Sequence, residues 1–190
     1  MVTSLRFLAF IILFLYSPIT QGQNSEINWN ALNRDKIIVE EITSSSGIPG
    51  VRVFFVVQGT RKAIWETLLD YENFPYIFQG IIKMKVLEQD SNGAQVEFWV
   101  DAVLMDLHYI LFRDYAEPGY RLTWQQVAGD LSDIQGSWQI LDTDDIDKKL
   151  MIYESYVDIG FLPVTWLIRL GAKRKAVEMG HRMRAWIENH

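Results

Sequence analysis

The sequence predicts an α+β fold in which a curved, seven-stranded antiparallel sheet wraps around one long C-terminal helix. Six segments between residues 81 and 158 alternate apolar and polar residues with a period of two, as half-buried strands do. Their connections are short and rich in turn residues, which makes neighbouring strands antiparallel. The last segment, 163–188, has the apolar spacing of an amphipathic helix.

The first 22 residues have the pattern of a secretory signal peptide, and we expect a single domain at 23–190. One basic residue, Arg6, precedes an apolar run of ten residues, Phe7–Tyr16, and a polar segment follows. Ten residues are too few to cross a hydrocarbon core, which needs about 20 in a helix. We therefore expect an exported protein that is periplasmic or extracellular once the signal peptide is removed.

Composition excludes several classes of function. The chain has 190 residues, 49% of them hydrophobic and 22% charged, which is typical of a globular protein. It contains no cysteine, so disulfides, thiolate metal sites and cysteine nucleophiles are excluded. The net charge of −6 argues against a nucleic-acid partner, which would need a concentrated basic surface.

The first half of the domain predicts one strand followed by two short helices. A polar lead-in at 24–36 precedes the β-branched segment 37–42, which we expect to be extended, and a Ser/Gly/Pro loop. VRVFFVV at 51–57 is the first strand of the predicted sheet. Thr60 can cap a helix at 61–69, and Pro75 can begin a second short helix at 75–80.

The second half supplies the other strands and the long helix. The predicted strands are 81–89, 94–102, 104–115, 120–128, 133–141 and 150–158. The final helix opens near Pro163 and carries one apolar stripe, made of Ile168, Ala172, Ala176, Met179, Met183 and Trp186. One helix can cover only part of a twisted sheet, so space should remain beneath it, with the two short helices closing one end.

Three stretches of the sequence carry a family resemblance. VRVFFVVQGTRKAIWETLLDYENFPYIFQGI, then GSWQI, then GFLPVTWLIRL at the start of the last helix together resemble the START-like (SRPBCC) superfamily, in its polyketide cyclase/dehydrase and coenzyme Q-binding branch. The resemblance covers about Gly50 to Ile187, and WETLLDYENFPYIF is its most specific part. It implies the helix-grip fold around a hydrophobic cavity, and it implies carriers of lipids, quinones or sterols more often than cyclases or dehydratases.

Four aromatic rings in DYENFPYIF at 70–78 are expected to form the entrance of that cavity. Tyr71, Phe74, Tyr76 and Phe78 would lie on and between the short helices, where the resemblance places the ligand entrance. The alternative is that these rings fill the end of the core, as aromatic side chains commonly do. As a group, they favour a gate.

Alternation along the strands predicts which side chains face inward, with Trp124 and Trp138 as possible donors to a ligand. The expected inward residues are Val96, Phe98, Val100, Leu107, Tyr109, Leu111, Leu122, Trp124, Trp138 and Tyr156. Arg113 and Tyr109 lie an even number of positions apart on one predicted strand, so Arg113 should also face inward. A buried pair of Arg113 with Glu154 or Asp158 could anchor the headgroup of a ligand or serve as a structural salt bridge. The predicted ligand-binding set is Tyr71, Phe74, Tyr76, Phe78, Phe98, Tyr109, Arg113, Trp124, Trp138, Tyr156, Trp166, Met179 and Met183. The alternative is a packed core with no cavity.

Support for catalysis is thin. The three histidines have no metal-ligand spacing, and no nucleophile elbow or phosphate-binding loop is present. We therefore expect no metal and no cofactor. If the protein is an enzyme of the cyclase, aromatase or dehydratase type, Glu154, Tyr156 and Asp158 are the candidate acid and base groups.

The preferred hypothesis is an exported protein that binds or carries a hydrophobic small molecule or lipid such as a quinone or isoprenoid. The basic face of the last helix, with Phe161, Leu162 and Trp166 at its start, suggests transient contact with a membrane. The alternative is a solvated surface, because basic runs on helices are commonly solvated. A third hypothesis is that the domain binds a protein partner. Export of the protein would argue against this hypothesis.

Overall fold

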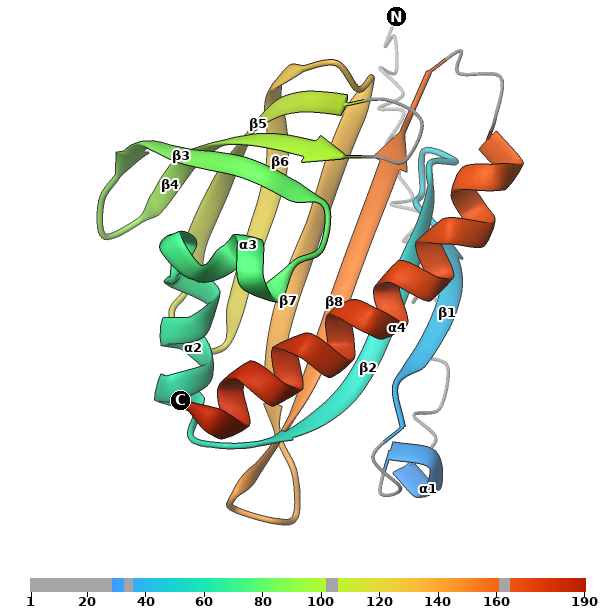
Figure 1. The fold of residues 1–190 in the computed structure, drawn as a ribbon. Coiled ribbons are helices and arrows are strands. Elements are labelled where there is room, and N and C mark those ends of the chain that lie inside the picture. Colours follow the sequence, from blue (N-terminus) through green and yellow to red (C-terminus); the bar gives the residue numbers. More distant parts are fainter. Residues whose placement is uncertain (1–28, 33–35, 102–105, 161–164) are drawn as a thin grey trace, which may run out of the picture.

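The computed structural model describes residues 29–32, 36–101, 106–160 and 165–190. Eight strands form one curved sheet, and a long helix crosses its concave side (Figure 1). The strands are β1 (Ile38–Thr43), β2 (Pro49–Gln58), β3 (Ile81–Gln89), β4 (Gly93–Asp101), β5 (Asp106–Glu117), β6 (Arg121–Gly129), β7 (Asp133–Asp142) and β8 (Lys148–Asp158). The helices are α1 (Trp29–Leu32), α2 (Arg61–Leu69), the 3₁₀ turn η1 (Tyr71–Asn73), α3 (Phe74–Ile77) and α4 (Thr165–Asn189).

The predicted α+β architecture is confirmed, with one more strand than expected. The strand order is β1-β2-β8-β7-β6-β5-β4-β3, and every neighbouring pair is antiparallel. The extra strand is β1, which pairs with β2 in a register that joins Val39 to Val53. The segment 37–42 was expected to be extended, but its sequence does not show that it pairs with the free edge of β2.

The two short helices form as predicted, with small shifts at their ends. The hydroxyl of Thr60 accepts a hydrogen bond from the Ala63 N–H at 3.1 Å and caps α2. Pro75 lies in the first turn of α3, which begins one residue earlier, at Phe74, and ends at Ile77 rather than at residue 80. The predicted signal peptide lies outside the described residues, and no helix in the described ranges is long and apolar enough to span a membrane.

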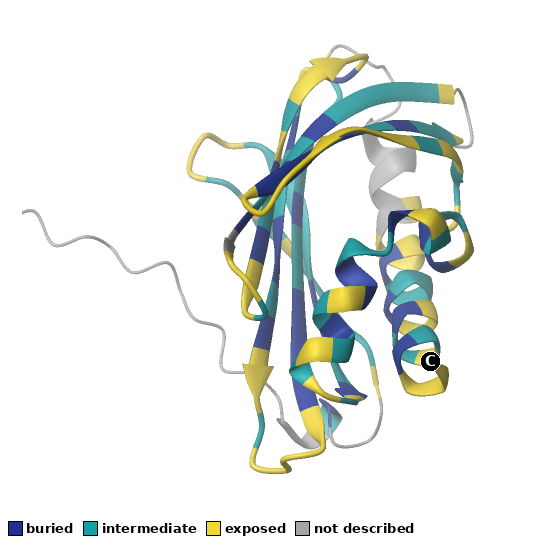
Figure 2. Cartoon of the chain, turned by 90° about the vertical axis from the view of Figure 1, so that its left-hand side faces the viewer, coloured by how far each residue is buried: buried dark blue, intermediate teal, exposed yellow. Residues whose placement is uncertain are grey.

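The main core lies between the concave face of the sheet and the helices. Val53, Phe55 and Val57 of β2 are fully buried there. Buried residues recur along the strands of the sheet and along α4 (Figure 2). The described part of the α4 stripe is confirmed, because Met183 and Ala176 are buried against this core. A smaller cluster lies on the convex face, where α1 covers β2 and β8 and Leu32, Phe54, Leu150 and Ile152 pack together.

The inward positions predicted for β8 are wrong by one residue. Tyr153 pairs with the inward Trp138, so Tyr153, Ser155 and Val157 face the helices. Glu154, Tyr156 and Asp158 alternate with them and occupy the convex face. The alternation of apolar and polar residues was misleading here, because β8 carries apolar residues on both faces. Ile152 faces outward and is buried by the cluster under α1.

Candidate functional site

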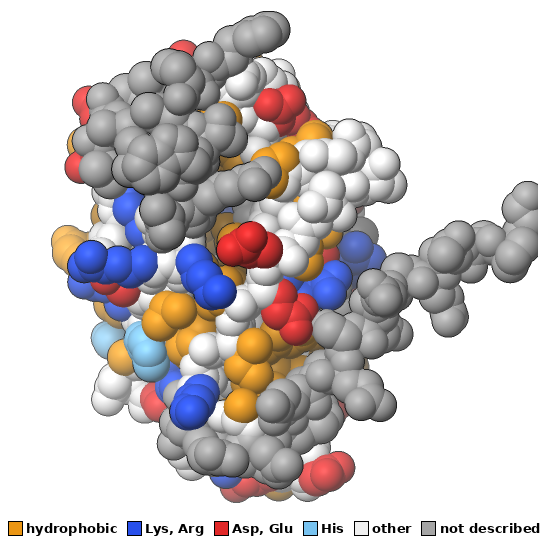
Figure 3. Space-filling model, turned by 90° about the vertical axis from the view of Figure 1, so that its right-hand side faces the viewer, with side chains coloured by type: hydrophobic (Ala, Val, Ile, Leu, Met, Phe, Trp, Pro, Cys, Tyr) orange, Lys and Arg blue, Asp and Glu red, His pale blue; other side chains and the backbone are white. Residues whose placement is uncertain are grey.

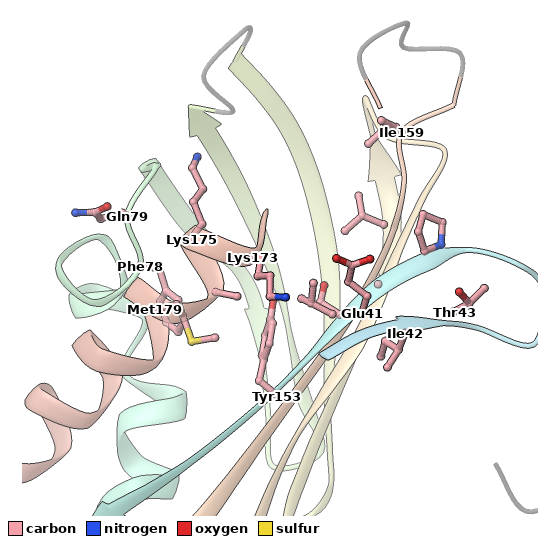
Figure 4. Close-up of a pocket in the computed structure, with 16 residues that line it drawn as sticks. Glu41, Ile42, Thr43, Phe78, Gln79, Tyr153, Ile159, Lys173, Lys175 and Met179 are labelled. Carbon is pink, nitrogen blue, oxygen red and sulfur yellow. The ribbon is translucent and has the colours of Figure 1, made fainter. Parts of the chain in front are cut away.

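A cavity of about 420 Å³ lies between α4 and the strands β1, β2 and β8. It lies beside the end of α3 and opens on the face of the molecule that carries α4 and β1. On that face, hydrophobic side chains are visible between acidic and basic ones (Figure 3). Its lining residues are Glu41, Ile42, Thr43, Pro49, Gly50, Val51, Phe78, Gln79, Tyr153, Ser155, Val157, Ile159, Lys173, Lys175, Ala176 and Met179 (Figure 4).

The wall of the cavity is mostly apolar, and its charged groups belong to exposed residues. Val51 and Val157 contribute from the sheet, and Met179 contributes from α4. Lys173 of α4 and Glu41 of β1 are exposed residues on opposite sides of the cavity (Figure 4). An apolar interior with a few polar groups is typical of sites for small molecules, and the volume lies within their usual range.

The space exists because small side chains meet where the sheet curves away from the helix. Ala176 of α4 and Ser155 of β8 both line the cavity with short side chains. Neither side chain is long enough to fill the gap that a twisted sheet leaves under a straight helix. At the other end of α4 the larger Met183 is fully buried, and the helix packs there on the main core.

A layer of rings separates the cavity from the deeper core. Tyr153, in the cavity wall, lies 4.7 Å from Trp138 and stacks on Trp124 at 5.5 Å between ring centroids. Phe78, also in the wall, lies 4.8 Å from Phe74. Burial raises the pKa of the Tyr153 phenol, so this group is neutral near pH 7. The layer therefore borders the cavity with aromatic rings and a neutral phenol.

Arg113 faces inward as predicted, but the predicted pair with a carboxylate is absent among the described residues. Glu154, one of the two expected partners, pairs with Arg52 on the convex face, with Nε and Oε1 2.5 Å apart. The guanidinium of Arg113 lies instead over the rings of Tyr71 and Phe74, 4.9 and 5.0 Å from their centroids. Its side chain is 3% exposed, and this burial lowers the pKa of the guanidinium.

The sequence matches a protein-family model over residues 57–184, which is more than half of the chain. That model is described as polyketide cyclase / dehydrase and lipid transport. The chain belongs to this family. A search of curated proteins found no match.

Solved structures show that this family member has the START-like helix-grip fold. The STAR-related lipid transfer protein from Xanthomonas axonopodis superposes with a TM-score of 0.64 at 14% identity, over 80% of this chain and 94% of that one. The Zhui aromatase/cyclase from Streptomyces sp. R1128 gives a TM-score of 0.63 at 18% identity, over 74% and 93% of the two chains. A START superfamily protein from Mycobacterium smegmatis gives 0.63 at 14% identity, over 74% and 97%.

The structure divides the predicted ligand-binding residues of this family member into three groups. Phe78 and Met179 line the cavity. Behind it, in the core, lie Tyr71, Phe74, Phe98, Tyr109, Arg113, Trp124, Trp138 and Met183. Tyr76 is 69% exposed and Tyr156 lies on the convex face, so neither faces the cavity, whereas the side chain of Trp166 lies outside the described residues. A role in ligand binding stays a prediction for all of them.

Sequence reasoning missed several residues of the cavity. Tyr153, Ser155 and Val157 were assigned to the wrong face, although pairing β8 against the inward Trp138 would have found them. Glu41 was missed because β1 was not placed in the sheet. Lys173 and Lys175 were read only as part of a basic helix face, and a single sequence carries no signal that they border a cavity.

The convex face carries a second, smaller cavity of about 350 Å³ with a polar lining. Glu154 and Tyr156, two of the three candidate acid and base groups, lie there beside Gln125, Gln135 and Ser137. They are separated from the first cavity by the thickness of the sheet. Within the described ranges no group of His, Asp and Glu side chains is arranged to hold a metal ion.

Proposed function

We propose that this protein is an exported carrier that binds a hydrophobic small molecule or lipid in the cavity beneath α4. The observation that carries the proposal is the cavity of about 420 Å³, with its apolar wall and charged rim. Burying apolar ligand surface there would supply about 25 cal/mol for each Å² removed from water. The family description, which includes lipid transport, supports the same class of ligand.

Export and membrane contact form the second part of the proposal. Export is supported by the basic residue, apolar run and polar segment of the first 22 residues. Contact with a bilayer is supported by the exposed basic residues Lys173, Arg174 and Lys175 of α4, beside the cavity. Expression of the full chain in a bacterial host should deliver a protein that starts near residue 23 outside the cytoplasm. Recovery of a chain that begins at Met1 in the cytoplasm would contradict export.

An aromatase or cyclase is the second candidate, favoured by one specific observation. The phenol of Tyr153 borders the cavity and could serve as an acid. The carboxylates expected to assist it lie on the convex face, and Glu41, the described carboxylate that borders this cavity, belongs to an exposed residue at its rim. We therefore prefer the carrier. Turnover of a polyketide-like substrate that is lost in Tyr153→Phe would reverse this preference.

Blocking the cavity tests the proposal. Val157→Trp places an indole in the cavity wall, and it should weaken binding of the neutral fluorescent probe N-phenyl-1-naphthylamine by about tenfold or more, because the probe and the ring compete for one space. Val127→Trp is the matched control, since Val127 is 52% exposed and lies outside the cavity. Equal binding by both variants and the wild type would contradict the proposal, as would organic extracts of the purified protein that never contain an apolar molecule.

A further inference from the structure

The second cavity, on the convex face of the sheet, has no part in the proposed carrier function. Short side chains lie at its centre, those of Thr123 and Ser137, which are register partners on β6 and β7. Longer side chains surround them, with Gln125 and Gln135 on one side and Arg121 on the other. The hollow of about 350 Å³ therefore follows from the sequence of outward-facing residues on two neighbouring strands.

Four hydroxyl and amide side chains of this convex cavity make no hydrogen bond within the described part of the chain. They are those of Thr123, Gln125, Gln135 and Ser137. Water can satisfy the more exposed amides, but Ser137 is only 5% exposed. Hydroxyl and amide groups both donate and accept, and folded proteins seldom leave buried ones unpaired. The cavity thus offers a set of donors and acceptors that the sheet holds in place.

The charges around the convex cavity are balanced. Asp114 and Glu154 line it with carboxylates, and Arg121 lines it with a guanidinium. Arg52 forms an ion pair with Glu154 from the neighbouring strand β2, so two negative groups stand beside two positive ones. Binding sites complement the charge of their ligands. A balanced, polar lining therefore favours a neutral ligand that is rich in hydroxyl groups over an ion or a lipid.

Two aromatic rings border the convex cavity at opposite ends. Tyr156 lies on β8 and Phe112 on β5, three strand spacings or about 14 Å apart. Each ring lies against a glycine of the next strand, because a Cβ atom on Gly50 would be 2.7 Å from Cδ1 of Tyr156, and one on Gly93 would be 3.0 Å from Cζ of Phe112. Both rings stay partly exposed, so each can offer a face to a ligand.

We propose that the convex cavity binds a neutral oligosaccharide. Sugar hydroxyls both donate and accept hydrogen bonds, and the C–H face of a sugar ring is apolar enough to pack on an aromatic ring. A short chain of sugar units packs on Tyr156 and Phe112, while its hydroxyls pair with the amides and hydroxyls between these rings. The site is separated from the first cavity by the sheet, so it is independent of the proposed function.

The geometry favours binding of the sugar over its hydrolysis. Glycosidases use two carboxyl groups about 5–10 Å apart. Asp114 and Glu154 lie on β5 and β8, about 14 Å apart by strand spacing, and Arg52 holds Glu154 toward β2. We therefore expect the oligosaccharide to be bound without being cleaved.

Isothermal titration calorimetry with four neutral oligosaccharides tests the proposal. The probes are chitotetraose, cellotetraose, maltotetraose and mannotetraose, and tetragalacturonic acid is the acidic counterpart. At least one neutral probe should bind with a dissociation constant of about 1 mM or lower, and more tightly than the acid. Its affinity should not change when N-phenyl-1-naphthylamine is present, because the two ligands occupy opposite faces of the sheet.

Variants of the cavity lining connect this binding to the convex face. Tyr156→Ala should weaken binding of the neutral probe about fivefold or more, because it removes one ring face, whereas Tyr156→Phe should stay within about twofold of the wild type. Tyr76→Ala is the matched control, since Tyr76 is 69% exposed and lies outside this cavity. If Tyr156→Ala does not fold, Gln125→Ala replaces it, at an exposed position whose amide lines the cavity, and should weaken binding several-fold.

Three results would overturn the proposal. The first is that no neutral probe binds at millimolar concentration, or that tetragalacturonic acid binds more tightly than all of them. The second is that the sugar displaces N-phenyl-1-naphthylamine, which would place it in the first cavity. The third is that Tyr156→Ala, or Gln125→Ala in its place, keeps the wild-type affinity, which would leave the ring and the amide with a structural role alone.

Discussion

Gly136 decides where the indole of Trp124 can lie. The two residues are register partners on β7 and β6, and a Cβ atom at position 136 would collide with the Trp124 ring and with the Glu154 carbonyl. The missing side chain lets the indole lie against the strand and stack on Tyr153, which is part of the cavity wall. A single glycine in the middle of the sheet thus shapes the ring layer behind the cavity.

Replacing Gly136 by alanine should destabilise the fold by about 1–3 kcal/mol, because one methyl group must displace backbone and a packed ring. Gly171, in α4, is the contrasting position, since an added Cβ would meet nothing within 4 Å. Gly171→Ala should stabilise the protein by about 0.5–1 kcal/mol through helix propensity. Urea unfolding measures both changes, and a neutral Gly136→Ala would show that Trp124 can relocate without cost.

At the scale of elements, α4 performs two tasks along its length. Near its C-terminus it packs on the core, where Met183 is fully buried and Ile187 is 6% exposed. Met179, one turn before Met183, lines the cavity, and so does Ala176, which lies still closer to the N-terminus of the helix. The same apolar stripe therefore contributes to the packed core at one end and to the wall of the cavity at the other.

The two methionines should respond differently to truncation. Met183→Ala leaves a void in packed surroundings and should cost about 2–5 kcal/mol. Met179→Ala removes a side chain that already borders open space, so its cost should be smaller, about 1–2 kcal/mol, while the cavity grows. Equilibrium unfolding in urea compares them directly. Equal costs would mean that Met179 is packed as tightly as Met183, with no cavity beside it.

At the scale of the whole molecule, the interior contains phenols that burial keeps protonated. Burial raises the pKa of Tyr109, with a further contribution from Tyr153, and it also raises the pKa of Tyr153. In the unfolded chain, tyrosine ionises near pH 10. Above that pH the unfolded state releases protons that the folded state retains, so the unfolded state binds fewer protons and stability falls as pH rises.

The protein should therefore lose stability steeply at alkaline pH. Each phenol that stays protonated only in the folded state contributes about 1.4 kcal/mol per pH unit to the slope above about pH 10, and its full stabilisation is present below that pH. Tyr153→Phe should reduce the slope by about that amount. Urea unfolding at about pH 9 to 11.5 measures the slope, with Tyr76→Phe, at an exposed ring, as the control. A slope that is unchanged in Tyr153→Phe would mean that this phenol ionises equally in both states.

Local patterns in the sequence predicted the order and type of the elements. Alternation identified the strands from β3 to β8, and the apolar run VRVFFVV identified β2. Thr60 marked the start of α2, and apolar spacing marked the stripe of α4 that includes Met183. These features depend on neighbours within one turn or one hairpin, so a single sequence carries them. Alternation failed in β8 because both of its faces are covered, the outer one by α1.

By itself, the sequence determined the curved sheet, the long helix and the inward position of Arg113, because each of these follows from periodicity along one segment. Only the tertiary structure decided that Arg113 has no described carboxylate beside it and that Tyr153, rather than Tyr156, faces the cavity. It also decided that the space lies beside Ala176 and Ser155. The physical reason is that a cavity and an unpaired charge depend on side chains from distant segments, and their distances are set by the twist and pairing of the whole sheet.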